Sequence, residues 1–275
     1  MSKERITWVV VPALLLAGCD LLSPSAERDT PETPVATGAQ VPDGTASPVP
    51  VGGARTVSEE TDLFFFEYSY PQEAGAIPEL AEWLDQLLDR RRQSLAADAA
   101  EGRERARSNG FPFNTYSSGT AWEVVADLPG WLSLSAALDS YRGGAHPNYG
   151  FDAILWDKAK ERALEPVALF TSPEALDNAL GDRLCDALNA EREKRRGIPV
   201  DPAAEDDFNA CIKPDETNLL LGSDGGEHFD RIGIQIAPYL AGPYAEGAYE
   251  FTFTVDEQIL EIVKPEFRGA FGAEG

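Results

Sequence analysis

The histidines are the first side chains to consider for chemistry, because the chain has only two of them, His146 and His228. They lie far apart, and no HxxxH, HExxH or CxxC spacing brings two metal ligands together. His146, in GGAHPN, could act as a ligand or a base. The expected alternative is a ring that hydrogen-bonds to backbone in a tight connection. The sequence therefore predicts no metal site and no catalytic residue.

The polar segment LGSDGGEHFD contains the other reactive side chains. Asp224, Glu227 and Asp230 could bind calcium, but the ligand order of an EF-hand is missing, so a hairpin loop is the better prediction. Ser223 follows a glycine directly, which is the wrong order for a nucleophile elbow. Because no phosphate loop or dinucleotide fingerprint occurs either, we expect a protein that is not an enzyme and uses no cofactor.

Aromatic side chains beside glycine-rich turns are the stronger candidates for function. Tyr141, His146 and Tyr149 lie in YRGGAHPNYGFD, whereas Tyr239 and Tyr244 lie in APYLAGPY. If they are exposed, such side chains can contact a protein or a glycan. Packing in the core is the alternative for at least half of the tyrosines. These five residues form the candidate ligand-binding set.

The elements that must position these residues follow from hydrophobic periodicity. An aromatic-rich run at 63–71 predicts a buried strand, and further strands are predicted at 121–129, 131–140, 149–157, 230–244 and 249–255, the run at 230–244 breaking at Pro238. Leucine spacing and capping residues predict a long helix from Pro78 to Asn109–Gly110, a second after Thr171 or Ser172, and a short one after Asp256. This order predicts an α+β fold with antiparallel sheets, each packed against a helix, in two related small domains.

Arginines form one dense basic cluster, on the long predicted helix. They are Arg90, Arg91, Arg92, Arg103, Arg105 and Arg107. Because acidic residues lie one helical turn away, we expect ion pairs along a solvated helix face. These acidic residues are Asp85, Asp89, Glu101 and Glu104.

The N-terminal sequence predicts the cellular location of the protein. Lys3 and Arg5 precede an apolar run that ends in Leu-Ala-Gly-Cys, which predicts a lipoprotein signal peptide at 1–18 and a lipid on Cys19. The alternative, an uncleaved signal anchor, would need about 20 apolar residues. Residues 19–56 are rich in Pro, Ala, Thr, Ser and Gly and predict a disordered tether. We expect a bacterial cell-envelope protein held at a membrane by its lipid, facing the periplasm or the exterior.

The net charge narrows the class of partner, and the cysteine content predicts a disulfide. The formal net charge of −24 argues against nucleic acid and would attract a cationic protein, although solubility alone can also explain an acidic surface. Of the three cysteines, Cys185 and Cys211 remain after lipidation. In an oxidising envelope they are expected to form a disulfide.

Three segments together resemble a known family. YRGGAHPNYGFD, EPVALF and IGIQIAPYLAGPYAEGAYEFTFTVDEQI follow one another as in the paired domains of unknown function of RsiV-type anti-sigma factors. The first domain also resembles the N-terminal domain of PdaC-type peptidoglycan deacetylases. The resemblance implies a PdaC N-terminal-like domain at 57–170 and an RsiV C-terminal-like domain at 171–275. It does not imply signalling to a sigma factor, because a lipid replaces the membrane span.

The resemblance also supplies a functional expectation, since this region binds lysozyme in the anti-sigma relatives. We expect a membrane-tethered, non-enzymatic binding module for lysozyme, another cationic protein, or peptidoglycan. The alternative is a cell-wall glycan hydrolase or a deacetylase-type enzyme that uses His146 and acidic neighbours.

Overall fold

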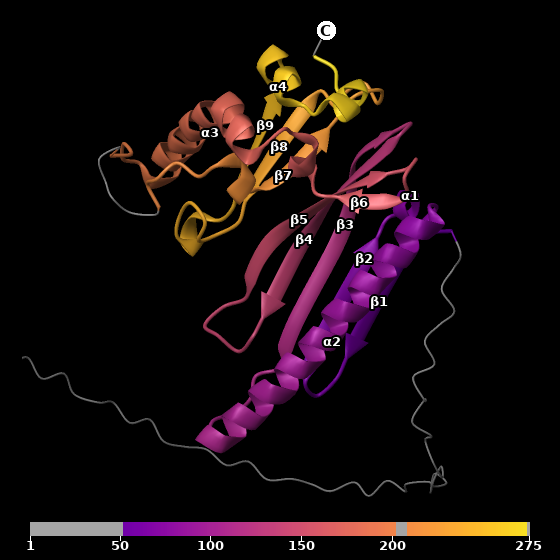
Figure 1. Ribbon diagram of the computed structural model, residues 1–275. Coiled ribbons are helices and arrows are strands. Elements are labelled where there is room, and N and C mark those ends of the chain that lie inside the picture. The colour runs from indigo at the N-terminus through magenta and orange to yellow at the C-terminus, as the bar shows by residue number, and fades with distance from the viewer. Residues whose placement is uncertain (1–51, 202–207, 274–275) are drawn as a thin grey trace, which may run out of the picture. The chain divides into compact units, whose positions relative to one another are not determined.

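The computed structural model describes residues 52–201 and 208–273 (Figure 1). The predicted signal peptide, Cys19 and most of the predicted tether lie outside the described residues. Within the described ranges, no helix has an apolar stretch long enough to cross a bilayer.

A six-stranded sheet forms the first layer. Its strands, in spatial order, are β1 (Arg55–Glu60), β2 (Phe64–Tyr70), β3 (Tyr116–Leu128), β4 (Trp131–Tyr141), β5 (Asn148–Asp157) and β6 (Arg162–Leu164). All neighbours pair antiparallel except β2 and β3, which are parallel. The expectation of a wholly antiparallel sheet is therefore corrected at one pair. The chain between β2 and β3 crosses over through a long helix, and such a crossover returns the chain in the same direction.

That helix, α2 (Pro78–Asn109), follows the short α1 (Gln72–Gly75) and covers one side of the sheet (Figure 1). It begins with Pro78 in its first turn and ends at Gly110, whose φ of 76° suits a residue without a Cβ. Its leucines pack on the aromatic side chains of β2, including Phe66 and Tyr68. The predicted bounds of this helix are thus confirmed.

Strand β1 was not predicted, because residues up to 56 were assigned to the tether. Arg55 and Thr56 pair with Tyr70 and Ser69 in the sheet. Arg55 also donates to Asp85 on α2 at 2.9 Å. The tether therefore ends at least two residues earlier than predicted, since β1 gains both a backbone partner and an ion pair to the helix.

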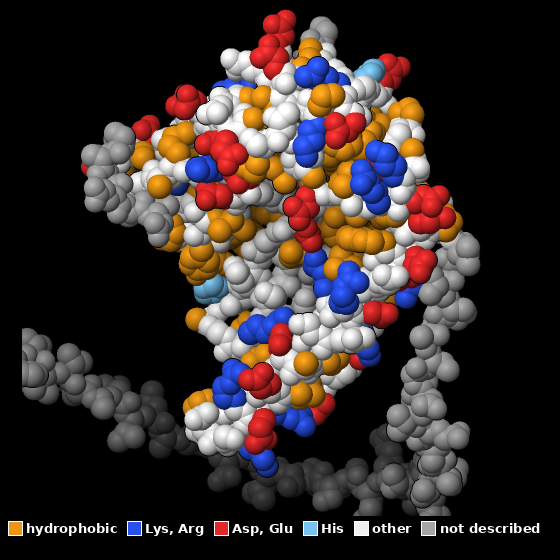
Figure 2. All heavy atoms as spheres, in the orientation of Figure 1, with side chains coloured by type: hydrophobic (Ala, Val, Ile, Leu, Met, Phe, Trp, Pro, Cys, Tyr) orange, Lys and Arg blue, Asp and Glu red, His pale blue; other side chains and the backbone are white. Residues whose placement is uncertain are grey.

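The arginines of α2 only partly follow the expected pattern. Two pairs lie within the helix, Arg105 with Glu101 and Arg107 with Glu104. Three arginines instead reach acidic residues of the sheet layer: Arg91 to Asp152, Arg92 to Glu59 and Arg103 to Asp62. Basic and acidic side chains accordingly intersperse along α2 in Figure 2. Because α2 lies directly on the sheet, its arginines lie within reach of the strands.

The second layer is a wholly antiparallel three-stranded sheet with helices. It contains η1 (Pro166–Leu169), α3 (Pro173–Arg196), η2 (Pro214–Glu216), β7 (Asn218–Gly222), β8 (Arg231–Ile236), η3 (Tyr244–Glu246), β9 (Tyr249–Thr254), α4 (Glu257–Ile262) and η4 (Pro265–Ala270). The Ser172 hydroxyl accepts from the Ala175 backbone N–H at 3.1 Å, and Asp256 caps α4 similarly, as predicted. The predicted hairpin loop joins β7 and β8. The α+β class is confirmed.

The second layer packs over one end of the first sheet, on the side opposite α2. A bulge at Val124–Ala126 lets β3 contribute Ala126 and Leu128 to the same core as Ile232. Leu155 of β5 joins that core as well. At the other end of the sheet, α2 covers one side, and no described helix or strand covers the opposite side. The division into two domains at residue 170 stays a prediction.

Candidate functional site

Four of the five candidate residues gather where the β4–β5 loop meets the segment 237–248 between β8 and β9. The rings of His146 and Tyr244 stack with centroids 4.0 Å apart, and Tyr149 meets Tyr244 edge-on at 6.0 Å. Tyr239 lies over His146 at 6.4 Å. We call these four residues the aromatic cluster. Tyr141, by contrast, lies on β4 opposite Ser117 and makes none of the ring contacts found among the described residues.

The ring of His146 is held by two hydrogen bonds. Nδ1 lies 2.8 Å from the Pro147 carbonyl oxygen, and Nε2 lies 3.2 Å from the Tyr239 hydroxyl. Because a carbonyl only accepts, Nδ1 carries the hydrogen, and in the neutral ring Nε2 accepts from the tyrosine. The expectation of a histidine bonded to backbone in the connection is confirmed. Both ring nitrogens are thus engaged within the chain.

Tyr239 adopts a backbone conformation that favours glycine. Its φ is 72°, and it lies in the turn Ala237–Leu240 after Pro238. A hydrogen bond of 3.3 Å from the Leu240 N–H to the Ala237 carbonyl closes this turn. A positive φ at the third position of such a turn normally selects Gly or Asn. The side chain is nevertheless a tyrosine that is 49% exposed. Strain combined with exposure points to a role outside core packing.

A buried arginine on α3 positions the segment that carries Tyr239 and Tyr244. The guanidinium of Arg192 is 0% exposed and donates to the Ala241 carbonyl through Nε at 3.0 Å and Nη2 at 2.8 Å. It also donates to the carbonyls of Asn209 and Ala210 at 3.2 and 3.1 Å. One side chain therefore ties the aromatic segment to the chain beyond α3.

Two further arginines in the last turn of α3 fix the other end of the segment. Arg196 donates to Glu246 at 2.9 Å, and the Tyr249 hydroxyl donates to the same carboxylate. Arg195 stacks 4.0 Å from the Tyr249 ring and donates to the carbonyls of Glu246 and Ala248 at 2.7 and 2.8 Å. Arginines near a helix C-terminus also complement its dipole.

These contacts shift the pKa values of the buried groups. Burial, reinforced by the Glu246 carboxylate, raises the pKa of Tyr249 to about 12. Burial alone would raise the pKa of Glu246, but the hydrogen bonds from Arg196 and Tyr249 outweigh it, and the net pKa lies below its ordinary value. At neutral pH, Glu246 is therefore ionised and Tyr249 protonated, the states in which both hydrogen bonds form.

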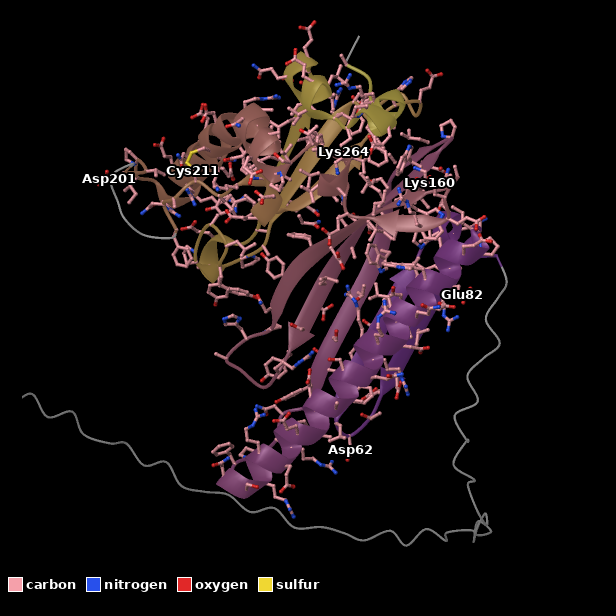
Figure 3. All side chains as sticks on the ribbon, in the orientation of Figure 1. Asp62, Glu82, Lys160, Asp201, Cys211 and Lys264 are labelled. Atoms are coloured by element: carbon pink, nitrogen blue, oxygen red, sulfur yellow. A yellow bond between two sulfur atoms is a disulfide. The ribbon has the colours of Figure 1, made fainter. Side chains whose placement is uncertain are left out.

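The predicted disulfide between Cys185 and Cys211 is present, and it lies beside α3 in Figure 3. The two Cα atoms are 5.2 Å apart, within the usual range for a bridge. Asn209 and Ala210, whose carbonyls bind Arg192, immediately precede Cys211 in the sequence. The disulfide therefore holds the backbone to which Arg192 binds.

Two of the acidic residues near His228, Asp224 and Asp230, are engaged locally. Arg231 pairs with Asp224 and lies 3.6 Å from Asp230. The Asp230 carboxylate also accepts from the Asp224 backbone N–H at 3.0 Å. Across the described ranges, no group of three His, Cys, Asp or Glu side chains is placed to hold a metal ion.

The arginine network was not predicted, although the sequence contains a signal for it. Leu176, Leu180, Leu184 and Leu188 form a buried stripe at four-residue spacing, and the next position in that stripe is Arg192. A charged residue that continues an apolar stripe must find partners in the interior. That position could therefore have been recognised as a structural arginine.

The comparisons with known proteins agree with this architecture. Residues 57–149 match the family model described as "Deacetylase PdaC". A DUF3298-family protein from Pseudomonas aeruginosa PAO1 has a similar structure, with TM-score 0.52 and 16% identity over 83% of this chain and 99% of that chain. A second, from Bacteroides fragilis NCTC 9343, gives TM-score 0.45 and 19% identity over 79% and 95%. No curated protein matches the chain.

The chain is thus an α+β protein whose fold is similar to that of the DUF3298-family protein from Pseudomonas aeruginosa. Its residues 57–149 are similar in sequence to the PdaC family. The resemblance to PdaC-type deacetylases is confirmed over that range, whereas the resemblance to RsiV-type anti-sigma factors stays a prediction.

Proposed function

We propose that the protein is a lipid-anchored envelope protein whose folded part binds a partner without catalysing a reaction. The partner is a cationic protein such as lysozyme, or a cell-wall component. The observation that carries this proposal is the aromatic cluster, whose exposed Tyr239 has a positive φ. The segment that contains it is tied to α3 by Arg192, Arg195 and Arg196. Aromatic side chains fixed before binding contribute contact area at a low entropic cost.

Charge and histidine geometry support the same proposal. A net charge of −24 attracts cationic partners over distance and raises their association rate. Both nitrogens of His146 are engaged by Pro147 and Tyr239, which favours a contact residue over a proton-transfer group. Lysozyme is the cationic protein that we propose to test first, because of the resemblance to RsiV-type anti-sigma factors.

Replacing Tyr239 with Ala should accelerate dissociation of the partner about tenfold, the effect typical of a buried aromatic contact. Surface plasmon resonance with residues 20–275 and lysozyme measures it, and pelleting with insoluble peptidoglycan provides the parallel assay. Raising salt to about 0.15 M should slow association, since the Debye length falls to about 8 Å, and should affect dissociation less.

The matched control is Phe111→Ala, because Phe111 is 58% exposed but is not part of the aromatic cluster. Equal dissociation rates for the two variants would show that the aromatic cluster is not part of the interface. If neither lysozyme nor peptidoglycan binds at low salt, the proposed function is wrong.

The second candidate is a cell-wall glycan hydrolase or deacetylase, which the description of the matching family model favours. In that case the purified protein should release reducing ends or acetate from peptidoglycan, and His146→Ala should abolish the release. Turnover that depends on His146 would replace the binding proposal with this enzymatic one.

Lipidation has its own test, and Cys19 lies outside the described residues. In a bacterial host, the protein should partition into detergent, and mass spectrometry should show a lipid on Cys19. Cys19→Ala should accumulate as unprocessed precursor, whereas the neighbouring Ser23→Ala should be processed normally. An unmodified Cys19, or detergent partitioning that Cys19→Ala leaves unchanged, would contradict the prediction.

A further inference from the structure

The uncovered half of the six-stranded sheet presents two rows of side chains on the side away from α2. Phe66 and Tyr68 point into the core under α2, so their neighbours in β2 point the other way. The strand register then aligns one row as Glu67, Gly119, Asp139 and Tyr149. The next row is Ser69, Ala121, Ala137 and Phe151. We call these two rows the acidic face.

The acidic face is the floor of a hollow of about 670 Å³. Ala248, just before β9, and Glu250, within β9, line one wall of the hollow. The Glu250 carboxylate accepts a hydrogen bond from the Gln235 amide at 3.0 Å. This volume lies within the range of known ligand sites. Tyr149 belongs both to the hollow and to the aromatic cluster, so the two surfaces are continuous.

Carboxylates on the two sides of this sheet have different surroundings. On the α2 side, Glu59 pairs with Arg92, and Asp152 pairs with Arg91 at 2.7 Å. On the acidic face, Glu67 and Asp139 form no ion pair with any described residue. Over 56–60, 65–69, 117–123, 135–141 and 149–153, the positions on this side include no lysine or arginine.

The arginine at the wall does not neutralise this charge. Arg195 donates to the Ala248 carbonyl, and its guanidinium is already paired with Glu191 at 2.9 Å. The acidic face thus lacks a cation within the described part of the chain.

Gly119 leaves room for the carboxylate of Asp139 on this face. A Cβ built at this position would lie 1.9 Å from Oδ1 of Asp139, so the carboxylate of Asp139 occupies the space above the glycine. Glu67 flanks Gly119 on β2 and Asp139 flanks it on β4, so the two residues lie on the same face of the sheet on either side of β3. Glycine inside a strand is otherwise unfavourable and often marks a close approach. A cation above Gly119 would have a carboxylate-bearing residue on each of the two neighbouring strands.

We propose that the acidic face docks a lysine- or arginine-bearing segment of a partner protein. The cation lies between Glu67 and Asp139, and its aliphatic stem packs along Tyr149 or Phe151, a combination that joins ion pairing with cation–π contact. This inference rests on the proposed function and names the surface that recognises the cationic partner. Charge complementarity selects a protein cation over a neutral glycan, which would stack on the aromatic rings but leave the carboxylates without a counter-charge.

The test measures binding of a fluorescent hexalysine peptide to residues 20–275 at low salt. Replacing both acidic-face carboxylates, as Glu67→Gln with Asp139→Asn, should weaken binding about tenfold, because each exposed ion pair contributes a factor of a few. Gly119→Ala should weaken it as well without changing net charge, since the added Cβ displaces Asp139. The melting temperature of the double variant should not fall, because neither carboxylate has a described ion-pair partner to lose.

The matched control is Glu82→Gln with Glu104→Gln, which removes the same charge from exposed positions of α2. Equal weakening by this control would mean that only net charge matters, and it would overturn the inference. So would the absence of hexalysine binding, or tight binding of the small polyamine spermine without binding of the peptide.

The same variants separate this inference from the proposed function. If lysozyme binds the Glu67→Gln, Asp139→Asn protein as tightly as the unmodified protein, the acidic face is not the docking surface although the proposed function holds. If neither lysozyme nor peptidoglycan binds the unmodified protein, the proposed function fails, and hexalysine still decides whether the face binds cations.

Discussion

Replacing Arg192 with Met should lower the free energy of unfolding by about 3–5 kcal/mol, because buried carbonyls lose a charged donor. The guanidinium is 0% exposed and donates to the carbonyls of Ala241, Asn209 and Ala210. Methionine continues the leucine stripe of α3 and replaces the aliphatic stem of Arg192, so the loss reports the buried guanidinium and its hydrogen bonds. Urea unfolding followed by circular dichroism measures the change.

Arg105→Met is the matched control for this prediction. Arg105 pairs with Glu101 on the exposed surface of α2, where the side chains are 63% and 72% exposed. An exposed pair of this kind contributes about 0.5 kcal/mol or less. If both substitutions change stability equally, the carbonyls around Arg192 do not depend on it. Arg192→Lys should fall between the two, because one ammonium cannot reproduce the two bonds to Ala241.

The same substitution should affect binding. Ala241 lies two residues after Tyr239 and three before Tyr244, so releasing its carbonyl loosens the segment that presents both rings. Partner dissociation should then accelerate even though Arg192 touches no partner. A variant that is less stable but dissociates at the unmodified rate would show that the aromatic cluster is held by the contacts of Arg195 and Arg196 alone.

Local signals explain which elements were predictable. Helix α2 begins at Pro78 and ends before Gly110, because its leucine spacing predicts a helix and the proline and glycine mark its two ends locally. Strand β1 is RTVSEE, where Val57 alone is apolar, so its pairing depends on β2. The parallel pairing of β2 with β3 depends on where α2 returns the chain, which no local pattern encodes.

The candidate site was predictable to a similar extent. Glycine-rich turns indicated where His146, Tyr149, Tyr239 and Tyr244 would be presented, and these four residues meet. Tyr141 lies on a regular strand, because the loop begins one residue later than the sequence pattern suggested. The acidic face could not be predicted, since Glu67, Gly119 and Asp139 align only through the register of three strands.

Removing the disulfide, as Cys185→Ser with Cys211→Ser, should lower the free energy of unfolding by about 3.5 kcal/mol in the loop-entropy model. The bridge joins residues 26 positions apart, and its removal enlarges the conformational freedom of the unfolded chain. A loss of this size corresponds to a melting temperature lower by about 7–14 °C for a chain of this length. Calorimetry of the oxidised protein, the reduced protein and the double variant measures it.

Three comparisons make this prediction specific. The reduced protein and the double variant should melt together, because both lack the same covalent link. Thiol labelling of the unfolded, unreduced protein should leave Cys185 and Cys211 unlabelled. Because Asn209 and Ala210 bind Arg192 just before Cys211, the double variant should also make Arg192→Met less costly than it is in the oxidised protein. Additive losses would instead show that the disulfide and the arginine stabilise the chain beyond α3 independently.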